Sequence, residues 1–123
     1  MAQAKDLMSG AGFSAPAANM LGFNAGAVTA AGTTSGAATA IPPTVTWANV
    51  TTASSNTGVK LPVATALNPL PLYTPVVVSC TGGQTGVVYP PSGATVNGTT
   101  SVNVSDNTMK TFYQVSATAW VGT

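Results

Sequence analysis

Few side chains in this sequence could carry acid–base chemistry. The chain has 123 residues with no histidine and no glutamate, and its only charged side chains are Lys5, Asp6, Lys60, Asp106 and Lys110. General acid–base catalysis mostly relies on histidine or on paired carboxylates. The two aspartates stand 100 positions apart, so they could pair only if the N-terminal segment folded over the later turn. We predict instead two solvated acids, one at a helix start and one in a turn.

The side chains needed for nucleophilic catalysis or for metal binding are also missing from the sequence. Cys80 has no histidine to activate it, and without a second cysteine it cannot form an intrachain disulfide. We predict a buried, inert thiol, with an intersubunit disulfide as the alternative. Zinc needs three or four Cys, His, Asp or Glu ligands, and one chain does not supply such a set. The stretch "GAGFSA" at 10–15 matches a dinucleotide-binding pattern, but the strand that the pattern requires does not precede it. We therefore predict no enzyme, no catalytic residue, no cofactor and no metal.

The low charge narrows the choice of partners. Charged residues make up 4% of the chain and the net charge is +1, so no basic stripe exists for nucleic acid. A small-molecule substrate is not expected either. Soluble monomers usually keep apart by charge, and a near-neutral surface of Thr, Ser, Ala and Gly predicts a protein that works in an assembly. A hydrated polar monomer is the alternative. No run approaches the ~18 apolar residues of a membrane span, so we expect a soluble protein made in a cytoplasm.

The sequence divides into two predicted regions, an N-terminal arm and a β domain. Residues 1–25 are predicted to form an N-terminal arm with one or two helical turns, because Ser14 suits an N-cap, Pro16 a first turn and Gly22 a helix stop. The arm contains small apolar anchors, which are Leu7, Met8, Met20 and Leu21. A segment this short does not form a stable helix alone, so we expect the anchors to contact a neighbouring subunit or another partner.

Residues 26–123 are predicted to form an all-β domain. Short runs rich in Val, Thr and aromatic residues alternate with turn sequences such as "TGGQTG", "PPSG", "NG" and "SDNT". Strands are expected near 44–47, 73–80, 86–89, 94–96, 99–104 and 110–121. The stretch "LPVATALNPLPLYTP" at 61–75 has four prolines and is predicted to be an extended loop. Close strand spacing without long helices is typical of a small antiparallel β-sandwich or barrel.

Several segments, taken in order, carry a family resemblance. They are "AKDLMSGAG", "VTAAGTTSGAATAI", "GVKLP", "VVVSCTGGQTGVVYPPSGATVNG" and "TFYQVSATAW". In this order and spacing the chain resembles the capsid decoration, or cement, proteins of tailed bacteriophages. The resemblance implies a compact β domain that forms a homotrimer on the outer surface of the virion capsid. There it would bind the major capsid protein and bridge capsomers, after synthesis in the host cytoplasm. The run Cys80 to Gly83 departs from the Asn-rich turn expected there.

Other readings remain open. A phage tail or head-fibre module that binds host surface glycans would use aromatic side chains in a groove, and the candidates are Trp47, Tyr73, Tyr89, Tyr113 and Trp120. A cell-surface or pilin-like subunit is a third alternative, and we expect it less because "MAQAKDLMSGAG" at 1–12 has no apolar run typical of a signal sequence. Trp120 follows other apolar residues near the end of the last strand, so it is predicted to pack in the core or at the seam between subunits. With the four arm anchors it completes the predicted capsid or subunit interface.

Overall fold

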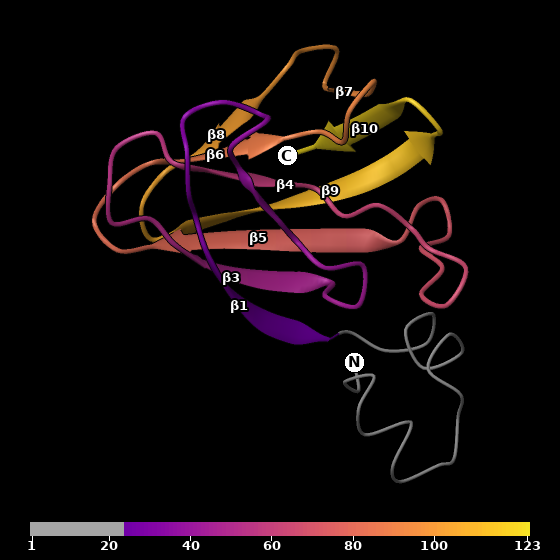
Figure 1. Ribbon diagram of the computed structural model, residues 1–123, viewed down its shortest axis with the longest axis horizontal. Helices are drawn as coiled ribbons and strands as arrows, with labels where there is room; N and C mark the ends of the chain where they lie inside the picture. The colour runs from indigo at the N-terminus through magenta and orange to yellow at the C-terminus, as the bar shows by residue number, and fades with distance from the viewer. Residues whose placement is uncertain (1–23) are drawn as a thin grey trace, which may run out of the picture.

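The computed structural model describes residues 24–123, which form two β-sheets packed face to face (Figure 1). The larger sheet has six strands in the order β1-β3-β5-β9-β10-β7, and the smaller has four in the order β2-β4-β6-β8. The strands are β1 (Ala25–Thr29), β2 (Thr39–Ala40), β3 (Trp47–Thr51), β4 (Gly58–Lys60), β5 (Pro75–Thr81), β6 (Gly86–Tyr89), β7 (Thr95–Val96), β8 (Val102–Val104), β9 (Thr108–Ser116) and β10 (Ala119–Gly122). The prediction of an all-β domain is confirmed. The predicted helical turns of the arm lie outside the described residues.

The chain crosses from one sheet to the other after nearly every strand. β1, β3 and β5 lie side by side in the larger sheet, while β2, β4 and β6 lie side by side in the smaller one. Both sets are parallel, with Ala25 beside Trp47 and Trp47 beside Val77. The first two thirds of the domain are therefore wound as successive coils, each of which contributes one strand to each sheet.

The predicted antiparallel pairing is wrong for most of the domain. Within residues 24–123, five of the eight strand pairs are parallel, and only the pairs β9–β10, β5–β9 and β6–β8 are antiparallel. Short connections favour antiparallel neighbours when they join strands of one sheet. Here they join different sheets, so the next strand of the same sheet runs in the original direction.

The space between the sheets is filled by small apolar side chains. Strands of the larger sheet alternate inward and outward residues, as in β5, where Val76, Val78 and Cys80 are buried between more exposed neighbours. Valines from the smaller sheet, such as Val59, Val88 and Val104, meet them from the other side. Phe112 and Trp120 are the largest fully buried side chains. The domain thus has one core, shared by both sheets.

The sandwich has two distinct ends, which we name for what they carry. At the loop end, on the right in Figure 1, β1, β3 and β5 begin, and residues 61–74 form the long connection into β5. At the turn end, on the left, residues 52–57, 82–85 and 105–107 make short crossings between the sheets. Any functional surface must be sought at these ends or on the outer sheet faces.

Candidate interaction surface

The charged side chains of residues 24–123 do not form a reactive group. Asp106, at the turn end, accepts hydrogen bonds from the Gly83 amide (3.0 Å) and from the Asn107 side chain (3.0 Å). The first bond ties the turn at 82–85 to the turn at 105–107 and the second lies within one turn, so the carboxylate is a structural acceptor. Within the described part of the chain, no three side chains of the His, Cys, Asp or Glu type lie close enough to share a metal ion.

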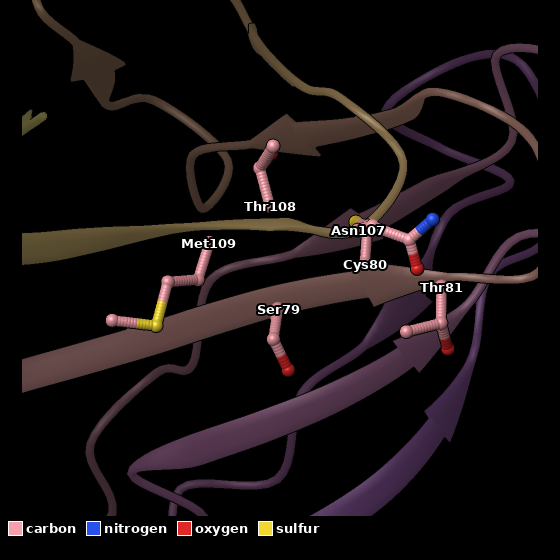
Figure 2. A pocket seen from close by; sticks show the side chains of 6 residues that line it. All are labelled: Ser79, Cys80, Thr81, Asn107, Thr108 and Met109. Carbon is pink, nitrogen blue, oxygen red and sulfur yellow. The ribbon is translucent and has the colours of Figure 1, made fainter.

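A shallow hollow of about 340 Å³ opens beside the turn end, lined by Ser79, Cys80, Thr81, Asn107, Thr108 and Met109. Ser79 and Thr81 project from one face of β5 and Cys80 from the opposite face, as alternation along a strand requires (Figure 2). Cys80 is 1% exposed, and burial raises the pKa of its thiol. A protonated, covered thiol is a poor nucleophile, so the hollow holds no reactive group, in line with the prediction of a buried thiol.

Most of the exposed large apolar side chains belong to the connection at the opposite, loop end. Six large hydrophobic side chains of residues 24–123 are exposed, and four belong to the connection 61–74. They are Val63 (59% exposed), Leu67 (78%), Leu72 (48%) and Tyr73 (65%). We call these four residues the platform. Isolated exposed hydrophobic residues are ordinary, but a group of them marks a contact site.

The platform is anchored to the core at several points. Leu61 and Leu70, in the same connection, are buried in the core. The Leu61 amide donates to the carbonyl oxygen of Tyr89 (2.9 Å), and the Tyr73 amide donates to that of Gln114 (2.9 Å). The connection is therefore fastened to both sheets, while its four platform residues face outward.

The backbone between the anchors is ordered by turns. The Thr65 amide donates to the carbonyl of Asn68 (3.1 Å), the Asn68 amide donates to the Thr65 hydroxyl (3.1 Å), and the Thr74 amide donates to the carbonyl of Pro71 (3.2 Å). Tyr73 has a φ of 68°, a left-handed conformation that is unusual for a bulky residue. Such strain persists only where the surroundings impose it. The platform is thus preformed, which lowers the entropy cost of binding.

The loop end is also poor in charge. The connection 61–74 contains no charged residue, and only Lys60 precedes it at the end of β4. Asp106 and Lys110 belong to the turn between β8 and β9 and to the first residues of β9, at the turn end. A partner at the platform therefore meets apolar and uncharged polar groups, and the contact does not depend on ion pairs.

The residues predicted for an interface have separate outcomes. Leu7, Met8, Met20 and Leu21 lie outside the described residues. Trp120 is 1% exposed and belongs to the core of the single chain. Of the two predicted positions, the core and the seam between subunits, Trp120 therefore occupies the core. Its indole Nε1 is buried without a hydrogen-bond partner. Since almost none of its side chain is accessible, Trp120 cannot contact a partner directly. It can affect an interface only by stabilising the core beneath it.

The aromatic residues considered for glycan binding do not form one groove. Tyr73 is exposed on the platform, and Trp120 is buried. Tyr89 belongs to the smaller sheet and donates its hydroxyl to the carbonyl of Thr33 (3.0 Å). Trp47 and Tyr113 are half-buried in the larger sheet. The hollow near Cys80 contains no aromatic side chain.

Comparisons with protein-family models, with curated proteins and with solved structures found no match for this chain. Within residues 24–123 there is also no helix long and apolar enough to cross a membrane. The platform was missed by sequence reasoning, although part of its signal was visible. The stretch 61–75 combines four prolines with Val63, Leu67, Leu72 and Tyr73, and apolar residues in a stiff loop have no strand or helix of their own to pack.

Proposed function

We propose that this chain is a capsid decoration, or cement, protein that binds the outside of a tailed-phage head as a trimer and stabilises contacts between capsomers. The observation that carries the proposal is a preformed apolar surface at one end of a domain with almost no charge. The order of sequence segments described above supports it. The proposal assigns the chain no catalytic residue, cofactor or small-molecule substrate.

The strand edges also suit a closed assembly. The edge strands are β1 and β7 in the larger sheet and β2 and β8 in the smaller sheet. Three of these four have only two or three residues. Short edge strands resist open-ended pairing between copies, and closed contacts are what a symmetric oligomer needs. Contacts through the loop end would therefore limit assembly to a defined number of subunits.

The predicted arm belongs to the same contact. Residue 24 enters β1 at the loop end, so residues 1–23 join the domain on the side of the platform. In the proposal the loop end faces the major capsid protein or a neighbouring subunit, and the apolar anchors of the arm, among them Leu7 and Met8, extend that contact. Trp120 takes no direct part.

A head-fibre or tail module that binds host glycans is the second candidate. Tyr73 favours it, because an exposed aromatic ring on a rigid loop can stack on a sugar. The remaining aromatic residues argue against it, since they lie buried, half-buried or on the other sheet. A single ring on a protruding loop offers less recognition than the groove that such modules need.

Sedimentation and head binding test the proposal together. The purified chain should sediment as a trimer at micromolar concentration, and it should saturate empty heads of the phage that encodes it. Replacing two arm anchors, Leu7→Ser with Met8→Ser, should weaken head binding at least several-fold. Met109→Ser, which changes an exposed residue at the turn end, is the matched control and should bind as the unmodified chain does. A monomer that leaves heads bare would overturn the proposal.

A further inference from the structure

The platform and the point where residues 1–23 join the domain lie at the same end of one sheet. β1, β3 and β5 are parallel and in register, with Ala25 beside Trp47 and Trp47 beside Val77. The platform connection leads directly into β5, and residue 24 leads directly into β1. The chain before residue 24 therefore arrives only two strands away from the platform.

Residue 24 itself is held firmly. The Asn24 amide donates to the Thr46 hydroxyl (2.8 Å), and the Asn24 side-chain amide donates to the carbonyl of Thr44 (2.6 Å). The Asn24 carbonyl oxygen accepts from the amides of Thr46 and Trp47. The start of β1 is thus fixed at the edge of the larger sheet, and the preceding residues are delivered to a defined point beside the loop end.

The distance from that point to the platform is short. Neighbouring strands are about 4.8 Å apart, so two spacings amount to about 10 Å. An extended chain covers about 3.3 Å per residue, and three or four residues are enough to cross. Met20, Leu21 and Phe23 fall within this reach.

The chemistry of the two segments also matches. Residues 13–23 read "FSAPAANMLGF", with no charged side chain and with four large apolar residues, which are Phe13, Met20, Leu21 and Phe23. No part of residues 24–123 covers the platform, whose side chains are apolar and uncharged. A tethered segment is present at millimolar effective concentration when its linker spans the gap. Because the platform is preformed, even a weak apolar contact is sufficient to hold the segment.

We propose that residues 13–23 of the same chain dock on the platform formed by Val63, Leu67, Leu72 and Tyr73. The docked segment covers apolar side chains that the domain leaves exposed, so a partner at the loop end would contact the docked segment rather than the bare platform. It also directs residues 1–12, with Leu7 and Met8, outward from the loop end. The docking itself does not depend on the proposed capsid function, whereas the use of residues 1–12 as a clamp rests on it.

A double-mutant cycle in the full chain tests the docking. Leu21→Ser and Leu67→Ser should each lower the midpoint of thermal unfolding by about 4 °C or more, since each removes one side of the same apolar contact. The double variant should fall no further than the lower of the two single variants, because a contact can be lost only once. Independent, additive shifts, or no shift from either change, would overturn the proposal.

A control variant and a dilution series identify the occupant. Met109→Ser alters a side chain that is 54% exposed at the turn end, so it should leave the midpoint unchanged and show no coupling to Leu21→Ser. The coupling between Leu21 and Leu67 should persist over a hundredfold dilution. A coupling that disappears on dilution would show that a second copy supplies the segment, and would refute docking within one chain.

Limited proteolysis gives a second readout under native conditions. Chymotrypsin cleaves after Phe, Leu and Met, so docking should protect the sites at Phe13, Met20, Leu21 and Phe23. Leu67→Ser should speed cleavage at these sites several-fold, while Met109→Ser should not. Equal cleavage rates in the unmodified chain and in Leu67→Ser would contradict the proposal, whatever the two unfolding midpoints are.

Discussion

Both ends of the sandwich carry connections that cross between the two sheets, yet the ends differ in what they do with their side chains. At the turn end Thr52 is fully buried, its amide donates to the carbonyl of Thr81 (2.7 Å), and its hydroxyl lies within 2.6 Å of the carbonyl oxygen of Gln84. At the loop end the platform residues stay exposed although their backbone is ordered. The turn end thus closes the fold, and the loop end displays a surface.

The loop end carries a conformational cost that the turn end avoids. Most left-handed residues are glycine or asparagine, as at Gly82 and Asn107 of the turn end, where the conformation is easily tolerated. Tyr73 adopts it at a cost of about 1–2 kcal/mol. The hydrogen bond from its amide to Gln114 returns about 0.5–1.5 kcal/mol. The backbone that carries the exposed Tyr73 ring is therefore fastened to the larger sheet through Gln114.

Amide exchange should separate the two ends most strongly. The Thr52 amide is buried and bonded, so its exchange requires an opening close to global unfolding. The Thr65 and Asn68 amides lie in an exposed connection and need only local opening. We expect Thr52 to exchange at least ~1,000-fold more slowly, measured by hydrogen–deuterium exchange with NMR. Similar rates at both sites would mean that the ends do not differ in local stability.

The core that both ends share should be most sensitive at Trp120. Trp120→Ala should lower the free energy of unfolding by about 3–5 kcal/mol, because it leaves a large cavity. Trp120→Phe should cost clearly less, since the indole Nε1 has no hydrogen bond to lose. Chemical denaturation measures both variants. An unchanged stability in Trp120→Ala would place the indole outside the core.

Gly86 tests the tight packing of the turn end. A Cβ at Gly86 would lie 2.7 Å from the sulfur of Cys80 and 3.0 Å from a methyl of Thr52. Gly86→Ala should therefore destabilise the domain by about 1–3 kcal/mol. Gly36→Ala is the matched control, because nothing lies within 4 Å of its Cβ position, and its melting temperature should match that of the unmodified chain or exceed it slightly. Equal behaviour of both variants would show that the turn end is loosely packed.

Salt should have the smallest effect. Among residues 24–123 the loop end has no charge beyond Lys60, so a contact made there by these residues gains little from ion pairs. Raising the salt concentration from low to molar should change the dissociation constant of the proposed trimer by less than about threefold, because screening acts on charges. Sedimentation at two salt concentrations measures it, and dissociation in high salt would point to a charged interface elsewhere.

Strand positions could be read from the sequence better than strand partners. The Val-rich run at β5 and the Asn97-Gly98 turn were visible as local patterns, because alternation and left-handed turns are local properties. Parallel pairing was not visible, since it depends on which sheet each connection enters. The stretch 110–121, predicted as one strand, is instead β9 and β10 with a turn at 117–118. No Gly, Pro or Asn marks that turn.

The candidate surface was only half visible. Cys80 was predicted to be buried and inert, and its burial is confirmed. The sequence could predict it because Cys80 lies on an apolar strand whose alternate residues face the core. The extended loop at 61–75 was predicted, but its outward-facing residues were not, since Leu61 and Leu70 turn inward while Val63 and Leu67 turn outward. No period distinguishes these pairs in the sequence. Only the anchoring contacts of the folded chain decide which side chains face outward.

Counting copies of this chain in purified virions is the most direct test of the proposed function. Quantitative mass spectrometry against the major capsid protein gives the number per particle. A decoration protein that forms trimers over the whole head should be present in hundreds of copies. A few copies per particle would contradict the account and favour the fibre module, and absence from the virion would refute both.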